Sequence, residues 1–264
     1  MNRLFKSLWH YRTFVISSVV AQFHARFVQN KLGVLWMIAN PLAQVTVYAL
    51  ILSSILAAKL PGINNTYAYA IYLTAGMLAW TLFTEILSRS VTLFVDNANL
   101  LKKLAFPKLT LPLIVTGTAL INALLLLVAA MGVFFLLGHH VGWVVLWLPL
   151  LFVLTILLAL SLGTLLGIFN VFIRDIGQLV PIVIQFWFWL TPVVYVPTII
   201  PVRYRDYLAY NPVTPLVQGF QNVLVFNRPP DVEGLALIAL VSLLIGAAAI
   251  ALYRKASAEM VDLL

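Results

Sequence analysis

The chain has 264 residues, of which 63% are hydrophobic and 9% are charged. Soluble domains carry roughly 25% charged residues, so this composition excludes a soluble globular protein. The net charge of +8 would favour nucleic acid as the partner of a soluble protein, but here the basic residues flank apolar stretches. That arrangement favours membrane lipids as partners and no nucleic acid. The absence of cysteine excludes disulfides, thiol nucleophiles and cysteine metal sites.

The first 31 residues form a basic stretch without acidic residues, in which large apolar side chains recur at helical spacing. This pattern predicts an amphipathic helix lying in the membrane interface over residues 1–31. A cleaved signal peptide is the alternative, because residues 13–21 have the length of its apolar region. Cleavage would leave Arg26 and Lys31 outside the cell, against the positive-inside rule, so we favour the uncleaved helix.

Six apolar stretches are long enough to cross a membrane, which takes about 20 residues of helix. They predict an all-α integral membrane protein in which residues 1–264 form a single transmembrane domain. Arg174–Asp175 makes a tight hairpin between the fourth and fifth spans. His139–His140 is interpreted as a turn between the third and fourth spans, and no metal site is predicted. The expected spans are residues 32–58, 68–95, 111–137, 143–172, 176–195 and 234–253.

Two connections stand out between the spans. Residues 96–112 place three lysines and two prolines between the second and third spans. Residues 196–233 form the longest polar connection and are rich in proline. Within that second connection, residues 215–226 are mostly apolar and predict a short, half-inserted helix.

The distribution of basic residues predicts which side of the membrane each connection faces. With the N-terminus inside, eleven Lys and Arg residues lie inside: Arg3, Lys6, Arg12, Arg26, Lys31, Lys102, Lys103, Lys108, Arg174, Arg254 and Lys255. Four lie outside: Lys59, Arg203, Arg205 and Arg228. This excess predicts cytoplasmic N- and C-termini and makes residues 96–112 cytosolic.

Glu85 and Arg89 are the charged residues within the predicted spans. They stand four residues apart, on one face of a helix. Two interpretations remain open: an intrahelical ion pair near the cytoplasmic interface, or a pair that lines a polar cavity.

The chain lacks the sequence features of an ATPase. No glycine is followed by lysine, so the G-x-x-x-x-G-K-[ST] loop that holds nucleotide phosphates is absent. The eight acidic residues are scattered, which argues against an enzyme and predicts no catalytic residue in this chain.

Several short motifs occur together in a recognisable order. They are Arg26–Phe27, Leu32-Gly33-Val34-Leu35-Trp36, Pro41–Leu42, LLKKLAFPKLTLPL (residues 100–113), Arg174–Asp175, Thr191-Pro192-Val193-Val194-Tyr195 and Asn211–Pro212. Across nearly the whole chain, this order resembles the membrane subunit of type 2 ABC exporters for bacterial surface polysaccharides, the O-antigen, capsule and teichoic acid group.

The resemblance implies a permease in the bacterial inner membrane that works as a homodimer with two copies of a separate ABC ATPase. ATP and Mg²⁺ would be bound by that partner, with no cofactor in this chain. The substrate would be a polysaccharide linked to undecaprenyl pyrophosphate, with O-antigen the nearest match. An exporter of a drug or simple lipid, or a polyprenyl-phosphate membrane enzyme, is the alternative.

The resemblance also implies roles for particular residues. A cytosolic coupling helix over residues 99–107 would contact the ATPase through Leu100, Leu101, Lys102, Lys103, Phe106 and Pro107, although topology alone also explains the lysines. Spans one and five would line the path with Trp36, Phe186, Trp187, Phe188, Trp189 and Tyr195. Four consecutive aromatic residues point around the whole helix, so at most two share one face.

Two further assignments concern the ends of the path. The basic residues Arg12, Arg26 and Lys31 would meet the lipid pyrophosphate at the entrance, since arginine suits bidentate phosphate contacts. Anchoring to ordinary lipid headgroups is the alternative for each of them. Short external helices between spans five and six, over residues 202–225, would gate the exit.

Overall fold

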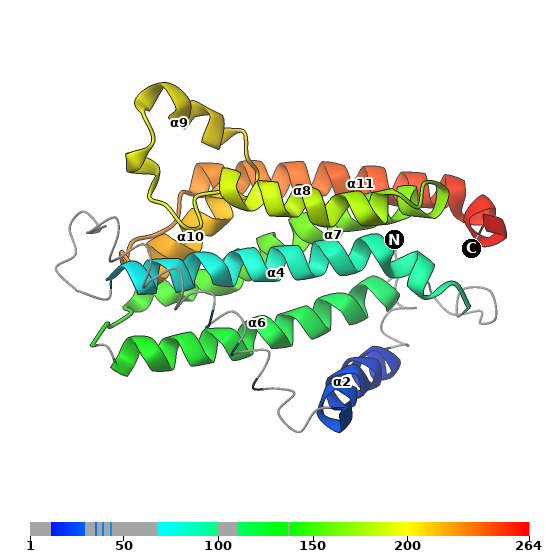
Figure 1. Ribbon diagram of the computed structural model, residues 1–264, viewed down its shortest axis with the longest axis horizontal. Helices are drawn as coiled ribbons and strands as arrows, with labels where there is room; N and C mark the ends of the chain where they lie inside the picture. The colour runs from blue at the N-terminus through cyan, green and yellow to red at the C-terminus, as the bar shows by residue number, and fades with distance from the viewer. Residues whose placement is uncertain are drawn as a thin grey trace.

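The computed structural model (Figure 1) describes residues 12–29, 68–99, 110–136 and 138–263, with the single positions 35, 39 and 43. Within these residues the chain forms helices and turns without a strand. The all-α prediction is therefore confirmed for this part of the chain. The predicted first span, residues 32–58, lies outside the described residues apart from those three positions.

Four helical segments of the described chain are long and apolar enough to cross a membrane. Together they make the protein a multi-pass membrane protein, whereas the total of six spans remains a prediction. A fifth apolar helix, α8 (Ile176–Leu190), is shorter. The four are α4 (Ala68–Asp96), α6 (Thr110–Leu136), η1 (Trp143–Trp147) running into α7 (Leu148–Phe172), and α11 (Val232–Leu263).

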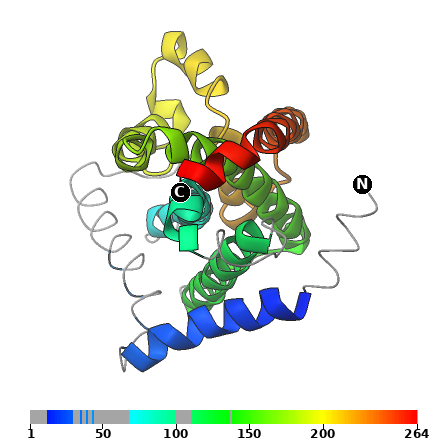
Figure 2. The same cartoon turned by 90° about the vertical axis from the view of Figure 1, so that its right-hand side faces the viewer.

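α2 (Arg12–Gln29) lies across one side of the bundle, beside α6 (Figures 1 and 2). Its Val19 is buried against α6 at Gly117, where an added Cβ would lie 2.9 Å from a Val19 methyl carbon. A glycine at this position therefore lets α2 approach α6 closely.

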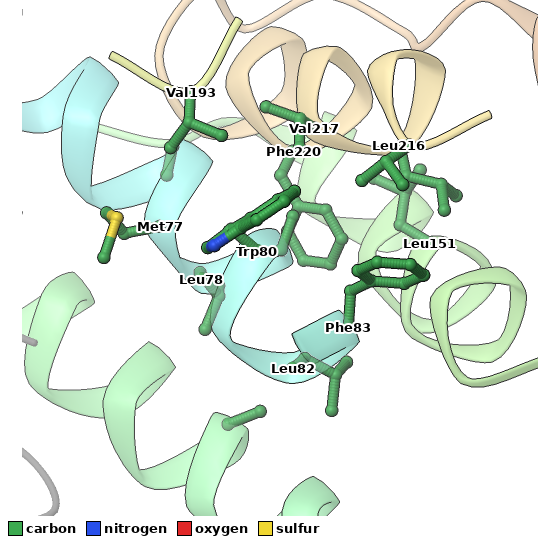
Figure 3. Packing of buried hydrophobic residues seen from close by; sticks show 14 of the residues in the cluster. Met77, Leu78, Trp80, Leu82, Phe83, Leu151, Val193, Leu216, Val217 and Phe220 are labelled. Carbon is green, nitrogen blue, oxygen red and sulfur yellow. The ribbon is translucent and has the colours of Figure 1, made fainter. Parts of the chain in front are cut away.

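α4 is the centre of the bundle, and most of its residues are buried. It packs against α6, α7 and α8 and against α10 (Thr214–Leu224). Figure 3 shows Trp80 and Phe83 of α4 beside Leu151 of α7 and Phe220 of α10. The predicted half-inserted helix is thus α10, and it is buried in the core rather than lying on the surface.

A pair of glycines brings α7 against α4. An added Cβ at Gly163 would lie 2.6 Å from the Cβ of Ser90, and one at Gly167 would lie 2.5 Å from the Ser90 carbonyl oxygen. The Gly-x-x-x-Gly spacing places both on one face of α7, an arrangement that lets membrane helices pack closely.

The fifth predicted span was expected to run to residue 195, but α8 ends at Leu190. Thr191 is extended, with φ of −106° and ψ of 135°, because it precedes Pro192, and a residue before proline is disfavoured in helical conformation. At the other end of the chain, α11 continues past its predicted end at residue 253, since charged residues do not interrupt a helix that leaves the membrane.

Between α8 and α11 the chain leaves the bundle and returns. η2 (Pro197–Ile199) leads to α9 (Val202–Ala209), which projects from the bundle in Figure 1. α10 then re-enters beside the first half of α4. The predicted short helices between spans five and six are therefore one projecting helix and one buried helix.

Candidate functional site

Two of the four consecutive aromatic residues of α8 face the interior of the protein. Trp187 packs edge-on against Phe83 with ring centroids 5.4 Å apart, and Phe188 packs against Trp80 at 5.5 Å. Because both partners belong to α4, this pair fixes the rotation of α8 about its axis.

The other two aromatic residues point away from the protein. Phe186 is 68% exposed and Trp189 is 57% exposed. They belong to a continuous apolar face of α8 that also carries two exposed glutamines, Gln178 and Gln185. The large exposed apolar residues of this face are Leu179, Ile182, Val183, Phe186, Trp189 and Leu190.

The turn formed by residues 191–195, which follows α8, is held by side chains from distant helices. The Tyr72 hydroxyl donates to the carbonyl of Tyr195 at 3.0 Å, and Gln221 Nε2 donates to the carbonyl of Pro192 at 3.0 Å. The Tyr69 hydroxyl donates to the carbonyl of Val194 in the same turn. Residues 191–194 are buried, and buried backbone outside a helix requires such partners, because no water is there to supply them.

Asn211 joins the same turn to the interior pair. Its Oδ1 accepts from Trp187 Nε1 at 2.9 Å, and its Nδ2 donates to Thr191 Oγ1 at 2.9 Å. The sequence alone predicts no role for the Asn211–Pro212 motif. The structure assigns Asn211 the role of fixing the end of α8.

Glu85 and Arg89 form an ion pair with N–O separation of 3.3 Å, and the pair is shared with two other helices. Asn122 of α6 donates to Glu85 Oε1 at 2.7 Å, and Arg89 donates to Gln22 Oε1 of α2 at 3.0 Å. Thr118 of α6 donates to the same Gln22 oxygen at 3.2 Å. The cluster therefore ties α2, α4 and α6 together.

Several predicted site residues lie outside the described residues: Lys31, Trp36, Leu100, Leu101, Lys102, Lys103, Phe106 and Pro107. Their assignments stay predictions. Arg12 is exposed at the first residue of α2, and Arg26 belongs to the same helix. The end of α4 and the start of α6, which flank the predicted coupling segment, lie at the same end of the bundle (Figure 1).

The amide and hydroxyl side chains of these clusters were missed by sequence reasoning. Gln22, Tyr69, Tyr72, Asn122 and Gln221 each stand in a mostly apolar stretch, which is the signal that marks such residues in membrane helices. In the described part of the chain, no three His, Asp or Glu side chains lie close enough to hold a metal ion.

Residues 14–225 match the family described as ABC-2 type transporter. This match covers most of the chain, so the protein belongs to the family of membrane subunits of ABC-2 type transporters. It is a transport subunit, consistent with the helical bundle and the missing phosphate loop.

Several individual proteins are similar to this chain along nearly the whole length of both chains. The O-antigen export system permease protein RfbA of Myxococcus xanthus is 29% identical over 264 residues, which is 99% of each chain. A Klebsiella pneumoniae protein of the same description is 23% identical over 90% of each chain. The polysialic acid transport protein KpsM of Escherichia coli is 23% identical over 90% of this chain and 92% of its own.

Proposed function

We propose that this chain is the permease subunit of an ATP-driven exporter that moves a polysaccharide linked to undecaprenyl pyrophosphate across the bacterial inner membrane. The observation that carries the proposal is the end-to-end similarity to O-antigen export permeases. O-antigen is accordingly the proposed glycan. The working unit is a homodimer with two ATPase subunits and with cytoplasmic N- and C-termini.

The outward face of α8 is the proposed wall of the translocation path. Phe186 and Trp189 present aromatic faces there, and the contacts of Trp187 and Phe188 with α4 support a fixed orientation of that face. Aromatic faces give sugars an apolar surface on which weak contacts form and break without trapping the chain. Trp36 of the first span is the proposed aromatic residue on the opposing wall.

Force from the ATPase enters through residues 99–107 in this proposal. The segment connects α4 to α6, and the Glu85–Arg89 cluster joins both of these helices to α2. A displacement of the segment would therefore move α2 together with its basic residues Arg12 and Arg26. Those residues, with Lys31, are proposed to receive the pyrophosphate at the cytoplasmic entrance.

We test the proposal by purifying the permease with and without its proposed ABC ATPase partner. The permease alone is expected to show no ATP turnover, and the complex is expected to turn over ATP and to move lipid-linked glycan into proteoliposomes. Robust ATP hydrolysis by the permease alone would overturn the proposal.

A further inference from the structure

A groove of about 470 Å³ lies between three membrane-spanning helices, away from the features described above. The start of α6, the middle of α7 and the middle of α11 form its walls. Its lining includes Leu113, Leu157, Leu160, Leu243, Ala247 and Ile250. Apolar cavities far smaller than this one stay dry and take up hydrocarbon, so hydrocarbon is the expected content of this groove.

The groove exists because α6 and α11 make little contact with each other, although both pack against α7. A hydrocarbon chain lying in it would complete the packing between these two helices. Viewed along the bundle in Figure 2, α8 and α11 lie at different edges, so the groove is separate from the proposed translocation face.

One end of the groove is positively charged. Leu243, Ala247, Ile250 and Arg254 are spaced at i, i+4, i+7 and i+11, which places exposed Arg254 on the face of α11 that lines the groove. Arg254 lies four residues beyond Ile250, or roughly 6 Å along the helix axis.

The first turn of α6 lies at that same end, because Pro112 and Leu113 both line the groove. Figure 1 shows the start of α6 and the last turns of α11 at the same end of the bundle. A cation, Arg254, therefore stands where an apolar groove meets the membrane surface.

We propose that the groove binds an acyl chain of an anionic phospholipid from the surrounding membrane, with its phosphate held by Arg254. Basic sites at the cytoplasmic ends of membrane helices select anionic headgroups in this way. The site does not depend on which substrate the protein exports.

The test measures lipid retention by the full chain purified in neutral detergent. Phosphatidylglycerol is added to delipidated protein, and bound lipid is quantified by mass spectrometry after washing. Ala247→Phe fills the groove, and its matched control is Ala248→Phe, an exposed neighbour outside the lining. Arg254→Gln removes the cation, and its control is the adjacent exposed residue, Lys255→Gln.

We expect retention to fall about fivefold in Arg254→Gln, the effect of one basic residue near the surface, and to fall at least as far in Ala247→Phe. Both controls should retain lipid like the wild type, and phosphatidylcholine should compete poorly. Equal retention by Ala247→Phe and Ala248→Phe, or equal competition by phosphatidylcholine, would contradict the proposal. Displacement by polyprenyl phosphate at lower concentration than by phosphatidylglycerol would show that the carrier, and not a phospholipid, occupies the groove.

Discussion

At the scale of single residues, the 191–195 turn shows how irregular backbone is accommodated in the interior of this protein. Each hydrogen bond from Tyr72 or Gln221 satisfies a carbonyl that would otherwise lie unpaired in an apolar setting. Hydrogen bonds between side chains in membrane proteins contribute about 0.6 kcal/mol on average and up to about 1.7 kcal/mol. The loss of any single hydrogen-bond donor to this turn is therefore expected to lower the stability of the protein measurably.

Gln221→Leu tests this expectation. The variant keeps a side chain of similar length but removes the donor to the Pro192 carbonyl, so we expect a loss of about 1 kcal/mol and a lower Tm. Gln218→Leu is the matched control, a half-buried glutamine on the same helix. Thermal unfolding in detergent compares the two variants, and an equal drop in Tm for both would contradict the assigned role.

Alanine substitutions of the four consecutive aromatic residues of α8 should distinguish an effect on stability from an effect on transport. Trp187→Ala and Phe188→Ala remove contacts with α4 and are expected to cost about 2 kcal/mol or more, because large aromatic side chains leave cavities. Phe186→Ala and Trp189→Ala remove exposed side chains and should leave Tm almost unchanged while export falls severalfold. Tm and surface glycan are measured for all four variants, and a normal rate of export in both exposed variants would remove α8 from the path.

At the scale of helices, the contact of α4 with α7 depends on two glycines. Gly167→Ala would place a methyl group 2.5 Å from the Ser90 carbonyl oxygen, so α7 must shift. Overpacking of this kind costs about 1–3 kcal/mol. The control is Gly132→Ala on α6, where an added Cβ meets nothing within 4 Å. We expect the first variant to lower Tm and the second to leave it unchanged or raise it. The reverse order would show that this close approach is unimportant.

The sequence predicted those helices that a local run of apolar residues is enough to reveal. Long apolar stretches predicted α4, α6, α7 and α11, because crossing a membrane sets the length of an apolar helix. The end of α8 was predicted wrongly, since residues 191–195 are as apolar as the helix before them. The donors that stabilise that turn stand about 120 residues earlier, on α4, or 29 residues later, on α10. No local pattern reveals such partners.

In the candidate site, too, local spacing revealed some features, whereas contacts with residues far away in the sequence were not predicted. The Glu85–Arg89 spacing left open an intrahelical ion pair or the lining of a polar cavity. It did not predict that Gln22 and Asn122 from two other helices join the pair. Likewise, the run of four aromatic residues predicted that they could not share one face. Which two point outward depends on Trp80 and Phe83, residues far away in the sequence.

At the scale of the whole molecule, the proposal requires a contact between residues 99–107 and the ATPase. The chain has no cysteine, so single cysteines introduced there can be crosslinked without background. We expect crosslinks to the ATPase from several positions in this segment. Cysteines in the turn at residues 139–142, at the other end of the bundle, are the control and should give none. Failure of every position in residues 99–107 would contradict the coupling role.

The most direct test of export is the distribution of glycan in a strain that lacks this chain. The account predicts that surface polysaccharide disappears while glycan linked to undecaprenyl pyrophosphate accumulates inside the cell, and that the wild-type gene restores export. Unchanged surface polysaccharide in the deletion strain, with no internal lipid-linked glycan, would contradict the account.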